Sequence, residues 1–503
     1  MRVPQENPDV QEQDGTRSGN EEHCSPSGRA QEASETHQCR VIGTGACVPN
    51  LNRYLVYFVH RHLEYRLAEV EAQAAATGIA DLPGGLTENL IWERPHGEIL
   101  DSPFWYLHLP GDGAVQKLAQ QIMLSKVFLE IWGEGDSWEE MCDSITSYPA
   151  HLKAPYATED QSFRFVVELW GGTLQIPEQV AFINQLEGPT QFKGRIDLQH
   201  PQHKFWVIMV VAPELTNGLP KVPARYYFGR EVAASDRSII KRYELPSRRY
   251  LGPTSMEAEM AFIMCNQAKV SRGSLVFDPF VGTGSILVAA AHRGAYTFGA
   301  DIDMRVIKLG KKDGGGSAVN VRTNFDDYGL PQPVGLLRAD LHRLPLRPGL
   351  EEVLDAIVCD PPYGVRAGGR KTAARDYTPR NRDTHIPATD PYQLGECLRD
   401  LLDAAARLLR IGGRLVYFLP AIPGYYSPEE VPAHPALTLV ANCEQVLSTR
   451  YSRRLITMEK TAGYDTSAAE AYHTASGPPS MAVDKLHEHV YAGRNDKGAD
   501  GLA

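Results

Sequence analysis

Two motifs in this chain carry side chains that could do chemistry on a bound ligand. The first is DPFVGTG at residues 278–284, and it follows the apolar run at 274–277. The second is DPPY at residues 360–363, and it follows the apolar run at 356–359. Short apolar runs of this kind predict buried strands. In an open α/β sheet, ligands bind beyond the carboxyl ends of the strands, so both motifs stand where a site is expected.

The first motif has the features of a cofactor-binding loop. Gly282 and Gly284 allow the backbone to approach a ligand closely, and Asp278 could hold the ammonium group of an amino-acid-bearing ligand. The motif is neither GxGxxG nor a phosphate loop with GK[ST], which disfavours a dinucleotide or a nucleoside triphosphate. The cofactor-binding residues predicted here are Asp278, Pro279, Phe280, Gly282, Thr283 and Gly284.

Three further acids follow predicted strands of the same region. Asp301 and Asp303 end the strand predicted at 296–300, and an acid at about this distance from the glycines can bind ribose hydroxyls. Either of the two can take this role. Asp340 could meet an adenine amino group. A ligand with a ribose, an adenine and an amino-acid tail fits all of these groups, so the predicted cofactor is S-adenosyl-L-methionine.

The second motif is the predicted catalytic loop. Pro361 and Pro362 fix φ and remove two N–H donors, so the loop is stiff and its carbonyl groups can face outward. An amino group could donate one hydrogen to the Asp360 carboxylate and one to the Pro361 carbonyl, which positions its nitrogen for attack on a methyl sulfonium. Tyr363 offers a ring for stacking an extruded base, and Asp360 could take the released proton. The expected reaction is methylation of an exocyclic amino nitrogen of a nucleic-acid base.

Strands and helices alternate from residue 251 to 462, which predicts a Rossmann-like α/β domain with a mostly parallel, doubly wound sheet. The predicted strands of this domain include 353–359 and 413–419, and its predicted helices are 285–291 and 392–409. An α+β region without a catalytic constellation is predicted at 53–215. Its expected strands are 54–59, 104–109, 163–169 and 205–211, and its expected helices are 114–132 and 177–186.

The segment between these regions, 216–250, is predicted to be a connector in which cations alternate with aromatic residues. That composition suits phosphate contacts and base stacking, although a solvated interdomain surface is the alternative interpretation. The residues concerned are Arg225, Tyr226, Tyr227, Phe228, Arg230, Arg237, Lys241, Arg242, Tyr243, Arg248, Arg249 and Tyr250. A second basic segment follows the catalytic motif, with Arg366, Arg370, Lys371, Arg375, Arg380 and Arg382. The polar segments 1–52 and 463–503 are predicted to be disordered tails.

Composition narrows the class of protein. The formal charge of −11 and the pI near 5.8 count against a protein whose whole surface binds nucleic acid. The chain of 503 residues has no run of about 18 apolar residues, so we expect no membrane span, and its first residues lack the apolar core of a signal peptide. Eight cysteines without a CxxC pair predict reduced thiols, no metal site and a cytoplasmic protein.

These residues together resemble the catalytic subunit of the eukaryotic tRNA (guanosine-10-N2)-methyltransferases. The similar stretches cover nearly all of residues 53–462. They are YLVYFVHRHLEYRLAEVEA, YYFGRE, SMEAEMAFIMCNQAKV, VFDPFVGTGSILVAAAHRGAYTFGADID, DAIVCDPPYGVRAGGRK and SRRLITMEK. Many amino-methyltransferases share DPPY, whereas YFVHRHL and SRRLITMEK at 452–460 are narrower signals.

The resemblance implies a THUMP-type RNA-binding module in the N-terminal region and methylation of the guanine N2 atom at position 10 of tRNA. It also implies an obligate small zinc-binding activator subunit in a heterodimer. The chain departs from the family in its two tails and in the short DGGG stretch at 313–316, which bear on loop shape. Two other interpretations are amino methylation of adenine or of a protein glutamine amide, and an inactive RNA-binding scaffold. Intact Gly282, Gly284, Asp301 and Asp360 argue against the scaffold.

Overall fold

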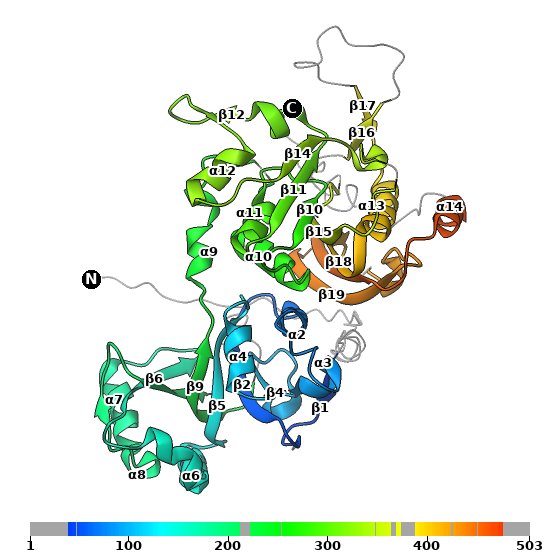
Figure 1. Ribbon diagram of the computed structural model, residues 1–503. Helices are drawn as coiled ribbons and strands as arrows, with labels where there is room; N and C mark the ends of the chain where they lie inside the picture. The colour runs from blue at the N-terminus through cyan, green and yellow to red at the C-terminus, as the bar shows by residue number, and fades with distance from the viewer. Residues whose placement is uncertain are drawn as a thin grey trace, which may run out of the picture. The chain divides into compact units, whose positions relative to one another are not determined.

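The computed structural model describes residues 39–475, apart from 47, 212–221, 253, 348, 364–368, 374–387, 424–425 and 450. Within these ranges the chain forms a nine-stranded sheet, a seven-stranded sheet and two short two-stranded hairpins (Figure 1). The nine-stranded sheet belongs to the N-terminal region, and the seven-stranded sheet carries both motifs. No helix among the described residues combines the length and apolar character needed to cross a bilayer.

The nine-stranded sheet has the order β1-β3-β4-β2-β5-β9-β8-β6-β7. Its strands are β1 (Arg40–Ile42), β2 (Asn52–Phe58), β3 (Ile91–Glu93), β4 (Phe104–Leu109), β5 (Ser125–Gly135), β6 (Ser162–Trp170), β7 (Arg195–Ile196), β8 (His203–Val210) and β9 (Arg225–Ala234). Its helices are α2 (Tyr65–Ala76), α3 (Gly85–Asn89), α4 (Asp112–Ala119), α5 (Trp138–Ser147), α6 (Ala150–Lys153), α7 (Ile176–Gln185) and α8 (Glu187–Thr190). Short 3-10 turns are η1 (His96–Glu98) and η2 (Ala154–Tyr156).

Strand β2 shows why the strands of this sheet have continuously apolar sequences. Tyr54, Val56 and Phe58 join the core under α2 and α4, while Leu55 and Tyr57 join the core on the other face. Successive side chains of a strand point to opposite faces, so a strand covered on both faces must be apolar throughout.

The seven-stranded sheet has the order β14-β11-β10-β15-β18-β20-β19. Strands β10, β11, β14, β15 and β18 run parallel, and β20 is antiparallel to both of its neighbours. The strands are β10 (Leu275–Asp278), β11 (Tyr296–Asp301), β14 (Gly335–Arg338), β15 (Leu354–Cys359), β18 (Leu409–Ala421), β19 (Leu437–Ser448) and β20 (Tyr451–Lys460). The hairpins are β12 (Lys311–Lys312) with β13 (Ala318–Val319), and β16 (Arg370–Thr372) with β17 (Thr389–Pro391).

Helices cover both faces of this sheet (Figure 1). Val276 and Val358 face the core that holds α10 (Ala258–Gln267), α11 (Ser285–His292) and α12 (Val321–Tyr328). Phe277 and Ile357 face the core that holds α13 (Leu394–Leu408). The other helical elements are α9 (Ser238–Arg242), η3 (Leu245–Ser247), η4 (Arg305–Leu309), η5 (Leu341–Arg343), η6 (Pro428–Glu430) and α14 (Thr466–Ala475).

Helix α2 packs directly on α10, and a buried polar cluster fixes the contact. Glu69 accepts hydrogen bonds from the backbone N–H groups of Met123 and Leu124, at 2.9 and 3.0 Å, and from the Asn266 side chain at 2.7 Å. Gln73 donates to the Asn266 carbonyl at 2.7 Å. Buried polar groups that are satisfied in this way hold two elements in one register.

The structure corrects three of the sequence-based expectations for the N-terminal half. The helix expected at 114–132 ends at Ala119, and β5 follows it, because β5 is buried between β2 and β9 and so lacks a clear alternation. The connector expected at 216–250 contains β9, an interior strand of the sheet. Disorder is wrong for part of the first tail, because β1 pairs in parallel with β3.

The second tail needs the same correction. Residues 466–475 form α14, whose Tyr472 ring lies 4.7 Å from the His434 ring and whose His473 lies 3.5 Å from Asp403. The predictions for residues 1–38 and 476–503 fall outside the described residues.

The basic character of 216–250 has a structural cause. Arg225 pairs with Glu134 at 3.0 Å, Arg230 pairs with Glu130 at 2.7 Å, and Arg237 pairs with Glu259 at 2.8 Å. Arg249 pairs with Asp327, while Arg248 donates to Ser285 at 2.6 Å. Tyr227, Phe228, Tyr243 and Tyr250 are buried. Arg225, Arg230, Arg237 and Arg248 are therefore engaged within the protein, whereas Lys241, Arg242 and Arg249 are exposed, and RNA contact by this segment stays a prediction.

Candidate active site

Four of the predicted acids meet at one edge of the seven-stranded sheet. Asp278 ends β10 and Asp301 ends β11, while Asp340 lies two residues after β14 and Asp360 directly after β15. These strands are adjacent and parallel in the order β14-β11-β10-β15. Their carboxyl ends therefore share one edge, where an open α/β sheet binds ligands.

The glycine turn between β10 and α11 is shaped by its own backbone and by Asp301. The Gly282 N–H donates to Asp301 Oδ2 at 3.1 Å, and the Phe280 N–H donates to Asp278 Oδ1 at 2.9 Å. Gly284 has φ +81°, and a Cβ there would lie 2.8 Å from a methyl group of Val321. A side chain at Gly284 would therefore strain the backbone and clash with α12.

The other predicted residues of this loop take part in its packing. Pro279 is buried, and Phe280 is half-buried against the core on the α13 side. Thr283 shares a hydroxyl hydrogen bond of 2.8 Å with Ser255, and its carbonyl accepts from Asn324 at 3.1 Å. These two neighbours hold the loop from the outside.

The acids at this edge repel one another. Burial raises the pKa of Asp278 well above its usual range, and the charges of Asp301 and Asp360 raise it further. Burial likewise raises the pKa of Asp301, and it raises the pKa of Asp360 to about 6. A cationic ligand would stabilise these carboxylates in their ionised form. S-adenosylmethionine, which carries an ammonium and a sulfonium group, fits this requirement.

Asp303 and Asp340 are already engaged in local contacts. Both Asp303 oxygens contact Arg305, whose hydrogen bonds lower the pKa of Asp303. One Asp340 oxygen accepts from the Arg343 N–H at 2.8 Å and the other from the Thr372 N–H at 2.9 Å. Asp340 thus caps η5 and holds β16, whereas the two Asp301 oxygens accept the backbone N–H groups of Gly282 and Asp303, at 3.1 and 2.9 Å.

The catalytic loop predicted from DPPY presents polar atoms that lack partners among the described residues. Pro361 is buried, and Pro362 and Tyr363 are half-buried. Asp360 Oδ2 lies 3.4 Å from Arg453 Nη1, whereas Asp360 Oδ1 and the Tyr363 hydroxyl are buried without a hydrogen bond. Unpaired buried polar atoms are costly, so they mark the place where a ligand could supply donors.

Arg453 is the residue at this site that the sequence did not reveal. It lies on β20, within the SRRLITMEK stretch, but 93 residues separate it from Asp360. The family-like stretch was the one available signal, and it gave Arg453 no role.

Most of the basic segment after DPPY lies outside the described residues, including Arg366, Arg375, Arg380 and Arg382. Arg370 donates to Thr389 at 2.8 Å across the β16–β17 hairpin, and Lys371 contacts Glu396 at 2.5 Å.

One group of side chains in the described part of the chain has the composition of a metal site: His342, Glu396 and Asp400. His342 contacts Asp400 at 2.9 Å, and the Lys371 ammonium lies against Glu396. Lys371 already supplies positive charge there, so the group is an ion-pair network between the hairpin and α13.

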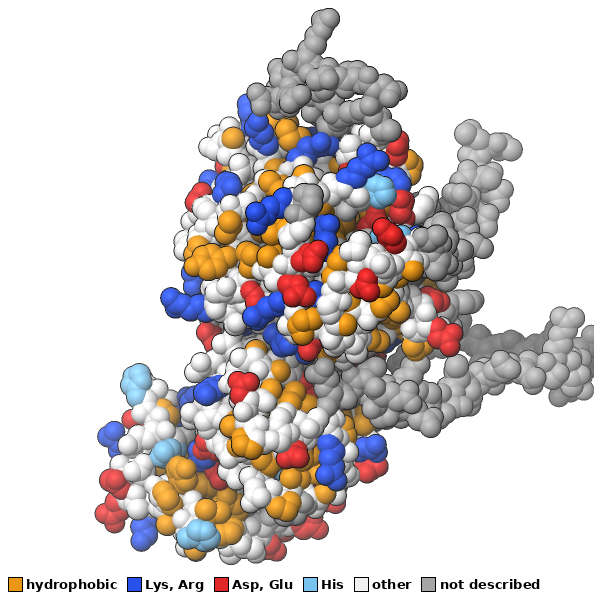
Figure 2. Space-filling view, turned by 45° about the vertical axis from the view of Figure 1, so that its right-hand side comes forward, with side chains coloured by type: hydrophobic (Ala, Val, Ile, Leu, Met, Phe, Trp, Pro, Cys, Tyr) orange, Lys and Arg blue, Asp and Glu red, His pale blue; other side chains and the backbone are white. Residues whose placement is uncertain are grey.

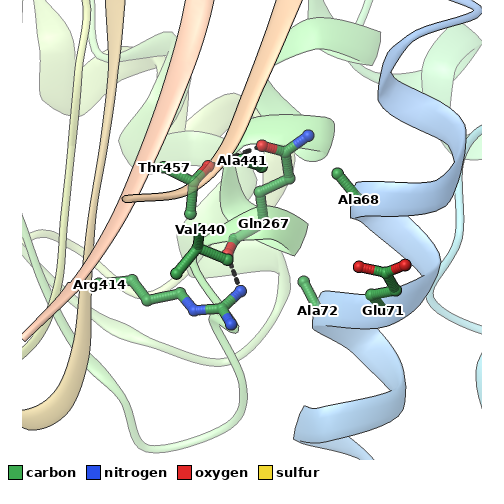
Figure 3. A pocket seen from close by; sticks show the side chains of 8 residues that line it. All are labelled: Ala68, Glu71, Ala72, Gln267, Arg414, Val440, Ala441 and Thr457. Atoms are coloured by element: carbon green, nitrogen blue, oxygen red, sulfur yellow. Dashed lines mark hydrogen bonds between the residues drawn. The ribbon is translucent and has the colours of Figure 1, made fainter. Parts of the chain in front are cut away.

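A small pocket lies away from these acids, between α2 and strands β18 to β20 (Figure 3). Arg414 donates to the Gln267 carbonyl at 2.9 Å and Thr457 to the Gln267 side chain at 2.7 Å. The lining contains none of the predicted cofactor or catalytic residues.

Comparison with known proteins agrees with this arrangement. Residues 52–237 match the Tmrp11 THUMP N-terminal domain, and residues 246–380 match the RMKL-like methyltransferase domain. The tRNA (guanine(10)-N(2))-methyltransferase TRMT11 of Mus musculus is 38% identical over 427 residues, which are 83% of this chain and 90% of that protein. The chain belongs to the TRMT11 family. The Homo sapiens protein of the same name is 37% identical over 82% of this chain and 89% of its own length.

The family and the two domain matches confirm the predicted fold class, a class I methyltransferase domain preceded by a THUMP-type region. Among solved structures, TrmN from Thermus thermophilus has 18% sequence identity and a TM-score of 0.38, covering 81% of this chain and 100% of that one.

Proposed function

We propose that this protein transfers a methyl group from S-adenosylmethionine to the exocyclic N2 atom of guanosine 10 in tRNA. The observation that carries the proposal is Asp360 Oδ1, a buried atom without a hydrogen-bond partner among the described residues, next to the acids and the glycine turn at one sheet edge, in a member of the TRMT11 family. The pairing of a cofactor turn with an acceptor for an amino group favours methylation of nitrogen.

The cofactor is held by the turn at 278–284 and by the acids around it. The bound cofactor supplies an electrophilic methyl group on a positively charged sulfur. Asp278 binds the ammonium group and Asp301 the ribose hydroxyls, because the Asp301 oxygens accept backbone N–H groups of Gly282 and Asp303, whereas Asp303 forms an ion pair with Arg305. Ionised Asp278, Asp301 and Asp360 together stabilise a ligand with two positive charges.

The target amino group donates one hydrogen to Asp360 Oδ1 and the other to the Pro361 carbonyl. These two acceptors fix the nitrogen and direct its lone pair away from the loop, so that positioning supplies much of the rate. Asp360, whose pKa burial raises to about 6, takes the proton released from nitrogen. The Tyr363 ring stacks on the extruded guanine.

A second subunit completes the enzyme in this proposal. Its support is the family resemblance together with the chain's charge of −11, which is unfavourable for binding polyanionic tRNA. Lys and Arg side chains on the face in Figure 2 are interspersed with Asp and Glu, so no single basic patch dominates that face. A small zinc-binding activator would add stability and RNA-binding surface. Expression with and without it, followed by size-exclusion chromatography, tests this requirement, and a fully active, monodisperse single chain would refute it.

We place the enzyme in the cytoplasm. The six cysteines that the structure describes are all free thiols, and five of them are buried, which suits a reducing compartment. Imaging of the tagged chain tests this placement, and accumulation in a secretory compartment would contradict it.

The test of the activity is mass spectrometry of tRNA treated with enzyme, activator and methyl donor. We expect N2-methylguanosine in the digest, located at position 10 by fragment analysis. Methyladenosine, or methylation of protein amides without tRNA product, would instead support a different acceptor.

A further inference from the structure

Arg453 contacts the acid at the centre of the catalytic loop and is itself held on several sides. Its Nε donates to Gln445 Oε1 at 2.8 Å, and its guanidinium carbon lies 3.7 Å from the centre of the Phe418 ring. Nη2 lies 3.8 Å from the Met256 sulfur, and Nη1 lies 3.4 Å from Asp360 Oδ2. The Arg453 side chain is only 14% exposed. A guanidinium fixed in this way presents its positive charge and its N–H donors to one carboxylate oxygen in a set orientation.

We propose that Arg453 is a positioning residue for methyl transfer, which holds Asp360 Oδ2 and thereby turns Oδ1 toward the target amino group. This inference rests on the proposed function. Arg453 touches Asp360 rather than substrate, so it acts through the carboxylate. By committing one oxygen it fixes the carboxylate plane, and by its charge it keeps Asp360 ionised and able to accept.

The charges around Asp360 support this assignment. Arg453 on β20 lowers the pKa of Asp360, whereas burial raises it. Asp278, at the end of β10, faces Asp360 with a like charge, and the Cys359 thiol next to it is buried with its pKa raised. The charge of Arg453 also acts on His62 and Tyr65.

Arg454 provides a matched control on the same strand. Its side chain is also 14% exposed, its Nε donates to Asn442 at 2.5 Å, and its guanidinium lies 4.3 Å from the centre of the Tyr426 ring. Successive residues of a strand point to opposite faces, so Arg454 is an equally buried arginine of the same strand that faces away from Asp360 and has other partners.

The experiment compares Arg453→Met, Arg453→Lys and Arg454→Met in the complex with activator. Single-turnover methylation of tRNA is followed from pH 5.5 to 9, alongside the KM for tRNA, cofactor affinity and thermal unfolding. We expect Arg453→Met to raise the apparent pKa of the rate by about one unit or more, since a nearby opposite charge commonly lowers a carboxyl pKa by 1–3 units. The rate should also fall at least tenfold near pH 6.5, with tRNA KM and cofactor affinity within about threefold of wild type.

Arg453→Lys should restore part of the rate and most of the pH profile, and Arg454→Met should behave as wild type. An Arg453→Met enzyme with the wild-type pH profile would overturn the inference, as would equal effects of the Met and Lys variants at every pH. A wild-type complex that methylates no tRNA would instead overturn the proposed function and this inference with it.

Discussion

Replacing Asp360 by Asn is expected to be almost as damaging as replacing it by Ala, and the contacts of Asp360 explain why. Arg453 presents N–H donors to Oδ2 at 3.4 Å, so the Asn side chain must turn its only oxygen toward Arg453. Its NH2 group then occupies the position of Oδ1, the atom that has no partner among the described residues. A donor would therefore face the hydrogens of the target amino group.

The loss is that of one charge-assisted hydrogen bond in the transition state, about 2–4 kcal/mol, or roughly 30- to 1,000-fold in rate. Single-turnover methylation at pH 8 with saturating cofactor measures it, because Asp360 of the wild type is ionised there. Cofactor affinity, measured by calorimetry, should stay within about threefold of wild type, since Asp360 contacts the acceptor. Asp81→Asn, at an exposed position between α2 and α3, serves as the control for charge removal. An Asp360→Asn enzyme within threefold of the wild-type rate would show that Asp360 Oδ1 does not accept a hydrogen from the target amino group.

Three further predictions follow from the cofactor edge and the helix contact. Asp301→Ala should weaken S-adenosylmethionine binding by about 1.5–3 kcal/mol in calorimetry, because a hydrogen bond to a charged group is lost. Asp303→Ala should weaken cofactor binding less than Asp301→Ala does. A larger loss for Asp303→Ala would assign the ribose hydroxyls to Asp303 instead of Asp301. Cofactor affinity should fall as pH falls, because Asp278 and Asp301 have raised pKa values and become protonated at a higher pH than ordinary carboxylates. An affinity that does not change between pH 5 and 8 would exclude this electrostatic contribution. Glu69→Gln should lower the free energy of unfolding by about 1–3 kcal/mol in denaturant titrations, since the backbone N–H of Leu124 would face an NH2 group. An unchanged midpoint of unfolding would show that the contact between α2 and α10 contributes little to stability.

The placement of the candidate site residues at one sheet edge could be predicted from the sequence because the signals for it are local. DPFVGTG and DPPY each follow a short buried strand, and the strand-turn-helix pattern places Asp278 and Asp360 at strand ends. Parallel pairing of β10 with β11 and β15 then brings these acids together without further information.

The remaining features depend on partners far away in the chain. The sequence left Arg225 and Arg230 open to phosphate contact or to a solvated surface, because their partners Glu134 and Glu130 lie on β5, about 90 to 100 residues earlier. Strand β5 is covered on both faces, so its sequence lacks the alternation of apolar and polar residues that predicts a strand. Strand β18 lies next to β15, and β20 pairs antiparallel with β18 on its other side. Arg453 on β20 reaches Asp360 only through this arrangement, which no local sequence pattern encodes.

The central claim is that the amino group on C2 of guanosine 10 is the methyl acceptor. Inosine lacks this amino group and keeps the rest of the purine, so a tRNA with inosine at position 10 removes the acceptor alone. The measurement is single-turnover methyl transfer to the inosine and guanosine forms of one tRNA by the complex with its activator. We expect transfer to the guanosine form, none to the inosine form, and similar binding of both. Equal methylation of the two tRNAs would contradict it.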